Sequence, residues 1–470
     1  MSIDLSGIEP VAPSLTAAFL EHHALLPLEL RDGTLRVATW LDAPPQQGLD
    51  DLAVLCDARI VVERGDEAPL RRAIQRLYGT EATARGMIDA LGSSVPATAS
   101  VRALDDLVAQ ANEAPVVRLV NLLIVEALQA RASDVHLETY AGALRVRYRV
   151  DGVLQEAPSP PVQLAAAVVS RIKIMAELDI AERRVPQDGR IRLRLQDRHV
   201  DVRVSTVPAL HGESVVLRLL DASRGRIALD ALGMSDDTLA RFRAVIARPH
   251  GIVLATGPTG SGKTTTLYAA VDALRTGREK ILAVEDPVEY ELPGVPQVPV
   301  NEKAGVTFAS ALRAMLRQDP DIMLVGEIRD GETAAIATQA ALTGHLVLST
   351  LHTNDAAGAL TRLRELGVAP YLVASTVEAV LAQRLVRTCC ADCRGAGCDA
   401  CRGSGFRGRV GIHELLVMTD ALRAAVQAGT DTRTLRQIAC TEGMRTLADE
   451  GARLVAAGVT SREEVMRVTA

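Results

Sequence analysis

An eight-residue segment, GPTGSGKT at 257–264, constrains the fold of this chain more than any other feature. It fits the pattern G-x-x-x-x-G-K-[ST], in which glycines let backbone N–H groups turn toward phosphate oxygens. The apolar run GIVLAT comes before it and a helix-forming stretch follows. The segment therefore predicts a strand, a P-loop and a helix that bind a nucleoside triphosphate in an α/β domain.

The loop supplies both backbone and side-chain contacts to the nucleotide. We expect Lys263 to reach the β- and γ-phosphates and the Thr264 hydroxyl to coordinate Mg²⁺. Only four lysines occur in the 470 residues, so an incidental lysine in a glycine-rich turn is the weaker alternative. The expected nucleotide contacts are Gly257, Pro258, Thr259, Gly260, Ser261, Gly262, Lys263, Thr264, Thr265 and Glu289.

Apolar strands alternate with helical stretches from Gly225 onward. This alternation predicts a largely parallel sheet that binds its ligand at the carboxyl ends of the strands. The segment AVEDPVEY places Glu285 and Glu289 at such an end, where carboxylates can orient Mg²⁺ waters or the attacking water. A solvated acidic turn is the alternative reading of this segment.

The next two strands also end in titratable residues. In DIMLVGEIRD, Gly326 stands where an aspartate is usual, and Glu327 is the candidate for polarising the attacking water. In TGHLVLSTLHTN, His345 and His352 are separated by about 20 Å of strand, and each is a candidate sensor of the γ-phosphate. A helix-capping glutamate and hydrogen-bonded structural histidines are the alternatives.

Pattern changes along the chain divide it into four parts. Residues 1–80 read as a small α/β module, and 81–104 as a linker without sustained periodicity. Residues 105–222 combine an amphipathic helix with strands of period two, and 223–470 form the P-loop domain. The sequence analysis predicts no internal repeat.

Five of the seven cysteines fall within 389–401. Among them, Cys390, Cys393, Cys398 and Cys401 form C-x-x-C-x4-C-x-x-C, a spacing that offers four thiolates to a structural zinc ion. We expect a zinc knuckle in a module at 386–412, with free buried thiols as the alternative. Cys389 is a neighbour without an assigned role.

Composition limits the surroundings in which the chain works. A formal net charge of -6 gives no general reason to bind nucleic acid, which concentrated positive charge would recognise. The first residues do not resemble a secretory signal, and no apolar run reaches the roughly 18 residues of a membrane span. We therefore expect a cytoplasmic protein that a partner recruits to the membrane.

The motifs GPTGSGKT, VEDPVEY, ALRAMLRQDPDIMLVGEIRD and TGHLVLSTLHTN, in this order, resemble the secretion ATPase superfamily. That superfamily includes the type II secretion ATPase (GspE class), the type IV pilus motors and conjugative relatives. The resemblance implies a RecA-like P-loop ATPase domain, an α+β (PAS-like) second domain and a homo-hexamer that binds ATP between the two. VRTCCADC and GFRGRVGIHELL also resemble the zinc-bearing extension of the type II secretion and pilus assembly enzymes.

The resemblance also assigns roles to four arginines and to other site residues. It implies that Arg313 and Arg317, and Arg203 and Arg218 acting in trans from the second domain, reach the phosphates. Any single arginine is otherwise read as a surface residue. The expected catalytic residues are Glu327, Lys263, Glu285, Arg203, Arg218, Arg313, Arg317, His345 and His352.

The function that the resemblance implies is ATP hydrolysis that powers pseudopilus assembly and protein export by a type II secretion system. The expected cofactors are ATP, Mg²⁺ and Zn²⁺. The expected partners are the cytoplasmic part of an inner-membrane secretion protein (GspL class), through residues 1–80, and an inner-membrane platform protein (GspF class), with no nucleic acid. A type IV pilus assembly ATPase and a nucleotide-gated scaffold with little turnover are the alternatives.

Overall fold

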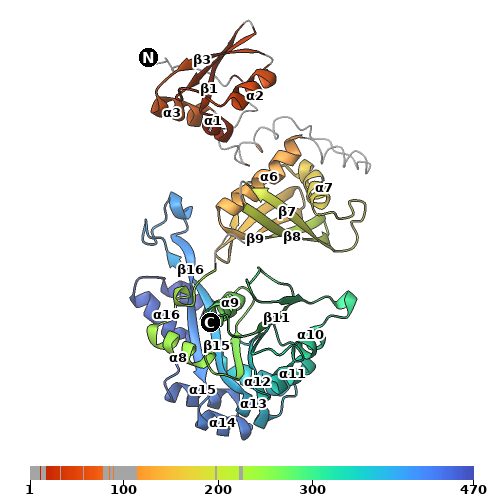
Figure 1. Ribbon diagram of the computed structural model, residues 1–470, viewed down its shortest axis with the longest axis vertical. Helices are drawn as coiled ribbons and strands as arrows, with labels where there is room; N and C mark the ends of the chain where they lie inside the picture. The colour runs from red at the N-terminus through yellow and green to blue at the C-terminus, as the bar shows by residue number, and fades with distance from the viewer. Residues whose placement is uncertain are drawn as a thin grey trace. The chain divides into compact units, whose positions relative to one another are not determined.

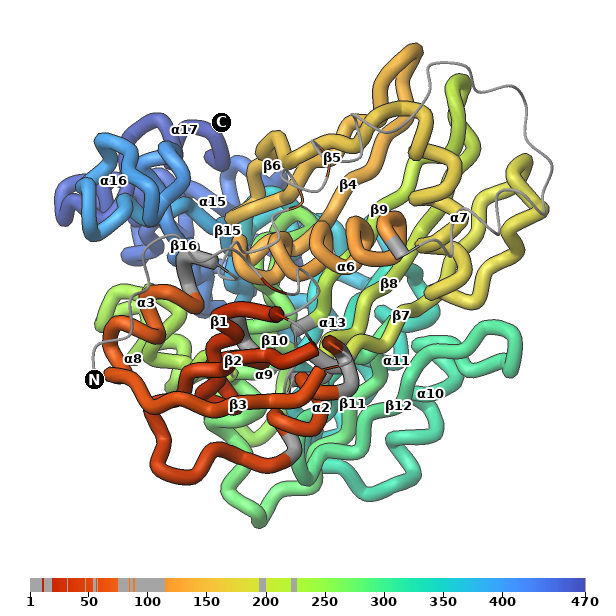
Figure 2. The backbone as a smooth tube through the Cα atoms, turned by 90° about the horizontal axis from the view of Figure 1, so that it is seen from above, coloured from red at the N-terminus to blue at the C-terminus, as the bar shows by residue number. Residues whose placement is uncertain are grey.

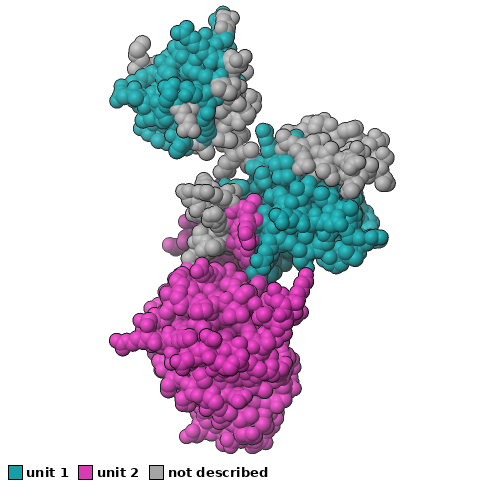
Figure 3. Space-filling view, turned by 45° about the vertical axis from the view of Figure 1, so that its right-hand side comes forward, with its two compact units in different colours: residues 1–150, 154–191, 202–219 teal, residues 151–153, 192–201, 220–470 magenta. Residues whose placement is uncertain are grey.

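The computed structural model describes residues 11, 17–31, 33–56, 58–77, 84, 88, 114–195, 198–221 and 226–469. The predicted linker at 81–104 lies outside the described residues except for Ala84 and Ile88, and so does the predicted boundary at 222/223. The chain divides into two compact units, which Figure 3 colours separately. The first contains residues 1–150, 154–191 and 202–219, and the second contains 151–153, 192–201 and 220–470.

The amino-terminal part of the first unit is a small α/β module. Its elements are α1 (Ala17–His23), β1 (Leu25–Arg31), β2 (Thr34–Thr39), α2 (Gln46–Cys56), β3 (Arg59–Arg64) and α3 (Glu67–Leu77). β1 and β2 form an antiparallel hairpin, whereas β3 pairs parallel to β2 after the α2 crossover (Figure 2). Buried leucines from both faces of this sheet give the module its own core.

The remainder of the first unit is an α+β domain. It contains α6 (Ala114–Gln129), β4 (Ala132–Tyr140), β5 (Ala143–Val150), β6 (Val153–Glu156), α7 (Ala165–Met175), β7 (Gln187–Leu195), β8 (Arg198–Ala209) and β9 (Gly212–Asp221). The strands form one sheet in the order β6-β5-β4-β9-β8-β7, and β4 pairs antiparallel with both neighbours. Alternate residues of the strands are buried, as the period-two pattern predicts, and Tyr148 of β5 donates to the Leu123 carbonyl of α6 at 3.1 Å.

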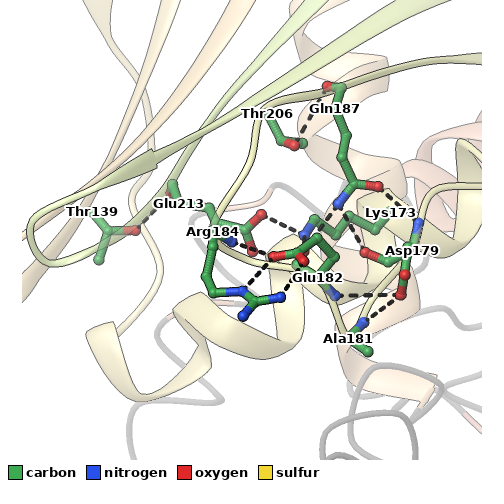
Figure 4. A network of polar contacts seen from close by, with 9 residues as sticks. All are labelled: Thr139, Lys173, Asp179, Ala181, Glu182, Arg184, Gln187, Thr206 and Glu213. Carbon is green, nitrogen blue, oxygen red and sulfur yellow. Dashed lines mark hydrogen bonds and ion pairs between the residues drawn. The ribbon is translucent and has the colours of Figure 1, made fainter.

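A buried lysine fixes the loop between α7 and β7 (Figure 4). Lys173 is 1% exposed, donates to the Glu182 carbonyl at 2.7 Å and forms an ion pair with Glu213. The Gln187 side chain closes the same loop, because it bonds both the N–H and the carbonyl of Asp179 at 2.9 Å. These contacts hold a polar loop in one conformation although few apolar side chains support it.

The second unit is built on a seven-stranded sheet in the order β12-β11-β13-β14-β10-β15-β16. Its strands are β10 (Gly251–Thr256), β11 (Ile281–Glu285), β12 (Gln297–Pro299), β13 (Ile322–Val325), β14 (Leu346–Leu351), β15 (Val377–Cys389) and β16 (Phe406–Val417). All neighbouring strands pair parallel except β15 and β16. The prediction of a largely parallel sheet is confirmed, and the central strands are buried throughout because helices cover both faces.

Two apolar cores lie on the two faces of this sheet. On one face pack α10 (Phe308–Met315), α11 (Gly331–Leu342), α12 (Ala356–Glu365), α13 (Pro370–Thr376), α14 (Asp420–Gln427) and α15 (Thr432–Thr441). On the other face pack α8 (Asp236–Ile246) and α9 (Lys263–Leu274). These cores are almost entirely aliphatic, in agreement with an aromatic content of only 2%.

A long antiparallel hairpin and two terminal helices complete the second unit. β15 and β16 continue beyond the sheet, and Figure 1 shows their tip standing out from the body of the unit. α16 (Leu447–Ala456) and α17 (Arg462–Thr469) pack against these strands through a small core that includes Val386 and Ile412. Among the described residues, no helix combines the length and apolar character that crossing a bilayer requires.

Candidate nucleotide and metal sites

The P-loop connects the buried strand β10 to the start of α9. Gly257 and Gly262 both have positive φ, and a Cβ at Gly257 would lie only 2.5 Å from the Gln383 carbonyl oxygen. Any side chain at position 257 would therefore clash with the Gln383 carbonyl oxygen unless the backbone moved. The amino end of α9 presents N–H groups and the positive end of the helix dipole to this loop, which suits phosphate.

Lys263 lies over the inside of the loop. Its ammonium donates to the Gly257 carbonyl at 2.7 Å and to the Pro258 carbonyl at 3.1 Å. Burial lowers the pKa of this ammonium, although the neighbouring Glu327 carboxylate acts in the opposite direction. The predicted phosphate ligand Lys263 follows β10 and the predicted water-polarising residue Glu327 follows β13, so both lie at the carboxyl edge of the parallel sheet. Thr264 follows in the first turn of α9, where a half-buried hydroxyl fits a Mg²⁺ ligand.

Glu327 and His352 form a pair at the carboxyl edge of the sheet. They follow the adjacent strands β13 and β14, and His352 Nε2 lies 2.9 Å from Glu327 Oε1. Arg329 Nε donates to the other carboxylate oxygen at 2.9 Å. The Glu327 side chain is 14% exposed, so a water molecule can reach a carboxylate whose position two neighbours fix. This geometry suits a group that orients and deprotonates water.

Glu285 lies deeper than the acidic-cluster prediction implied. It is 3% exposed at the end of β11, where Tyr268 donates to one carboxylate oxygen and Gln297 Nε2 donates to the other at 2.9 Å. Burial raises the pKa of Glu285, and the nearby charge of Glu289 adds to that effect. Glu289 itself is exposed. Both oxygens of Glu285 are therefore engaged within the protein.

His345 lies at the opposite edge of the sheet. It precedes β14, its carbonyl accepts from the N–H of Gly251 at 3.1 Å, and its Nδ1 lies 2.9 Å from the Ala340 carbonyl oxygen. The six residues of β14 span about 20 Å. The structure thus does not bring His345 to the P-loop, and the expected contact with a γ-phosphate held by the same chain does not fit this position.

The four predicted arginines occupy two surfaces. Arg313 forms an ion pair with Glu332, and Arg317 donates to the Arg313 carbonyl at 2.9 Å, so these two exposed side chains lie in the last turn of α10 and just beyond its end. Arg203 and Arg218 alternate with buried residues of β8 and β9, which places both on the sheet face opposite α6. Arg218 Nε donates to Asp134 at 3.0 Å. Their predicted contacts with phosphate remain predictions.

Two residues of β15 that the sequence analysis missed border the P-loop. Gln383 is 2% exposed and accepts a hydrogen bond from Thr266 of α9 at 2.6 Å. Arg384 is 8% exposed and also lies against the loop. Their sequence context, AVLAQRLVR, contains no motif, and only their position opposite the P-loop strand reveals them.

The four predicted zinc ligands come together at the tip of the β15–β16 hairpin. Their sulfur atoms all lie within 4.8 Å of one another, and three pairs are separated by 3.7 to 3.8 Å. Sulfur atoms at the corners of a tetrahedron, each about 2.3 Å from a central Zn²⁺, lie about 3.8 Å apart. The residues therefore fit a tetrahedral zinc ion. They are Cys390, Cys393, Cys398 and Cys401.

Backbone N–H groups donate to two of these sulfurs, those of Cys393 and Cys401. Although burial acts to raise the pKa of the Cys401 thiol, N–H groups of Cys398 and Gly405 lower it to about 6. Cys393 Sγ likewise accepts from the N–H of Gly397 at 3.2 Å. Hydrogen bonds to sulfur favour the thiolate, which is the form that binds zinc.

The metal site is an internal repeat, contrary to the expectation that the chain has none. Residues 390–397 read CADCRGAG and residues 398–405 read CDACRGSG. In both copies the arginine after the second cysteine has positive φ, and the closing glycine donates its N–H to that cysteine. A repeat of only eight residues does not stand out in a search for longer units.

Comparison with known proteins places this geometry in context. The family described as "Type II/IV secretion system protein" matches residues 109–467. "Type II secretion system protein E" of Pectobacterium carotovorum is 46% identical over 499 aligned positions, covering 100% of this chain and 99% of that protein. "Type II secretion system protein HxcR" of Pseudomonas aeruginosa is 55% identical, covering 77% of this chain and 79% of that protein.

Solved structures show the same fold. A structure described as "the Pilus Retraction Motor PilT and Bound ADP" aligns with a TM-score of 0.53 and 28% identity, covering 74% of this chain and 95% of that one. The Legionella pneumophila ATPase DotB aligns with a TM-score of 0.58 and 22% identity, covering 75% of this chain and 95% of that one. The fold class predicted for the chain is therefore confirmed.

Proposed function

This chain belongs to the type II/IV secretion system protein family, and on that basis we propose that it hydrolyses ATP to power pseudopilus assembly and protein export by a type II secretion system. One structural observation carries the hydrolytic part. Glu327, fixed by His352 at 2.9 Å, lies at the same edge of the sheet as the P-loop and close enough to Lys263 to affect its pKa. A protein that only binds nucleotide does not require such a group.

The residues divide the work of hydrolysis between binding and proton transfer. The P-loop N–H groups and Lys263 hold the β- and γ-phosphates, and Thr264 offers a hydroxyl ligand to Mg²⁺. Glu327 accepts a proton from the attacking water, while Lys263 stabilises the negative charge that develops on the transferred phosphoryl group. Arginines of a neighbouring chain, Arg203 and Arg218, would complete the charge compensation in a homo-hexamer.

The choice of type II secretion over pilus assembly rests on the relatives. "Type II secretion system ATPase E" of Vibrio cholerae is 50% identical over 392 aligned positions, with 78% of this chain and 77% of that protein covered. Relatives named for type II secretion also align along the whole chain, including residues 1–80. We infer that this module docks on the cytoplasmic part of an inner-membrane secretion protein (GspL class), and that the ring acts on a platform protein (GspF class).

A replacement in the bacterium that carries this gene tests the proposed function. Glu327→Gln should abolish the appearance of exported enzymes in the medium at unchanged levels of the ATPase. The matched control Glu302→Gln, on an exposed turn, should leave export unchanged. Loss of surface pili with normal export would instead support the pilus assembly alternative. Normal export and normal pili with Glu327→Gln would support the scaffold with little turnover.

A further inference from the structure

Arg384 is a buried cation that donates to backbone carbonyls from three segments and to the side-chain oxygen of Asn354 at 3.4 Å. It donates to the Gln383 carbonyl within β15 at 3.0 Å, to the Asn354 carbonyl after β14 at 2.9 Å and to the Val468 carbonyl in α17 at 3.2 Å. At 8% exposure, burial lowers the pKa of this guanidinium. A buried charge is costly, and the nearby carboxylates of Glu414 and Asp355 offset part of that cost.

The guanidinium lies directly behind the P-loop. A Cβ built on Gly257 would be 3.1 Å from Arg384 Nη1 and 2.5 Å from the carbonyl oxygen that Arg384 bonds. Burial lowers the pKa of Lys263, and electrostatic repulsion from the positive charge of Arg384 lowers it further. A change in the position of the Arg384 guanidinium would therefore alter both the packing behind Gly257 and the electrostatic potential at Lys263.

Arg384 also supports the loop that carries His352. Asn354 is two residues beyond His352, and its carbonyl accepts from Arg384 Nη2. The intervening Thr353 donates its N–H to the Thr256 hydroxyl, at the end of the P-loop strand, at 2.9 Å. This loop is thus held from β10 and from β15, and its histidine in turn holds Glu327.

The third contact connects this site to the carboxyl-terminal segment. Val459 accepts from the N–H of Cys389 at 2.8 Å, beside the zinc ligands, and Glu464 of α17 forms an ion pair with Arg387. Val468, one turn later, bonds Arg384. The segment 459–468 therefore runs along β15 from the cysteine cluster to the P-loop and is attached at both ends.

We propose that Arg384 is a positioning residue for ATP hydrolysis that couples α17 to the P-loop and to the loop bearing His352. The proposal rests on the proposed function, because it concerns the same site. An arginine suits this role because its planar fork carries five donors that reach carbonyls in different directions, whereas a lysine carries its donors on one nitrogen. Arg384→Lys should therefore preserve charge and lose the coupling.

Kinetics of the assembled ring provide the first test. Arg384→Lys should lower kcat by about 100-fold, the effect of a misplaced catalytic group, with little change in the affinity for ADP. Arg364→Lys is the matched control, since Arg364 also donates to two backbone carbonyls, those of Gly429 and Thr430, on another part of the unit. Equal kcat values for the two variants would overturn the proposal, as would a parallel loss of ADP affinity and kcat.

Hydrogen exchange at 462–469 provides a second test that does not depend on turnover. Binding of Mg·ADP should slow exchange in α17 of the unaltered protein and of Arg364→Lys, but not of Arg384→Lys. The same nucleotide-dependent change in all three proteins, or none in the unaltered protein, would overturn the coupling. A chain that fails to hydrolyse ATP but shows the exchange effect would contradict the proposed function and the positioning role in hydrolysis, and would retain only the coupling of α17 to the nucleotide site.

Discussion

The two glutamates that the sequence predicts at the carboxyl edge of the sheet, Glu327 and Glu285, differ in their exposure to solvent. Glu327 keeps one side accessible and contacts His352 and Arg329, whereas Glu285 is enclosed by Tyr268 and Gln297. A carboxylate that must accept a proton from water needs access to that water. Glu327 is therefore the better general base, and Glu285 is better suited to fixing the end of β11 and the residues beside it.

The raised pKa of Glu285 predicts a pH-dependent effect of replacing it. Burial raises the folded-state pKa of Glu285 above its unfolded value. The contribution of Glu285 to the stability of the fold therefore falls as pH rises through the folded-state pKa. Glu285→Gln removes this titration. The free energy of unfolding of the variant, relative to that of the unaltered protein, should therefore increase from about pH 5 to about pH 8, which means that the variant becomes relatively more stable.

Denaturant unfolding at both pH values measures this difference. Glu302→Gln, at an exposed position, should show no such change. A difference for Glu285→Gln that stays constant with pH would contradict the assignment of a raised pKa.

Motifs revealed those site residues whose chemistry requires a fixed local spacing. Gly257, Lys263 and Glu327 lie next to strand ends that alternate with helices, so their meeting at one edge follows from parallel pairing. Gln383 and Arg384 come from a distant strand, and nothing local distinguishes a buried arginine from the many exposed ones. The six residues of β14 separate the two histidines, so only His352 lies at the carboxyl edge of the sheet beside Glu327.

Regular periodicity also decided which elements the sequence could reveal. The period-two alternation predicts β5, β7, β8 and β9 of the α+β domain, and the apolar runs predict β10, β11, β13 and β14 of the second unit, but neither pattern predicts β12, β15 or β16. β1 was missed because Pro27 interrupts LLPLELR, where the register shifts between Pro27 and Glu29.

The hairpin tip is the element whose stability depends most on a metal. Apart from its cysteines it is mostly small or charged, so a zinc ion would supply on the order of 10 kcal/mol toward ordering it. We expect about one zinc per chain, the content of a single four-thiolate site, and its loss in Cys390→Ser/Cys393→Ser. Elemental analysis of the purified protein measures this directly.

Cys389 and Cys440 offer matched controls for the metal site. Neither belongs to the four-sulfur cluster, so Cys389→Ser and Cys440→Ser should retain zinc. Unchanged zinc in Cys390→Ser/Cys393→Ser would contradict the site. The repeat also predicts that Cys393→Ser and Cys401→Ser lose zinc to a similar extent, because the two cysteines occupy equivalent positions in the two copies.

At the scale of the whole molecule, the proposed hydrolysis requires the positive charges of Arg203 and Arg218 from a second chain at the phosphates. The phosphate site of one chain contains Lys263 and Glu327, whereas Arg203 and Arg218 lie on strands β8 and β9 of the other unit. The sequence could identify these parts but not their arrangement, because loosely patterned segments such as 81–104 carry no information on how units pack.

Mixing inactive chains tests this division of roles. Lys263→Ala removes the phosphate ligand and Arg218→Gln removes the proposed trans charge, so each variant alone should be inactive in rings. Mixed rings should regain part of the activity, because some sites combine an intact P-loop with an intact arginine from the neighbour. ATP hydrolysis over a series of mixing ratios would show this, and no recovery at any ratio would contradict a shared site.

The most direct test of the account is the rate of ATP hydrolysis by a forced hexamer with and without Glu327. We predict that Glu327→Gln lowers the rate by about 100-fold or more, the usual contribution of a general base, whereas Glu302→Gln has no effect. Both variants should bind ATP as the unaltered protein does. Equal, negligible rates in the unaltered hexamer and in Glu327→Gln would contradict the claim that this chain is a hydrolytic motor.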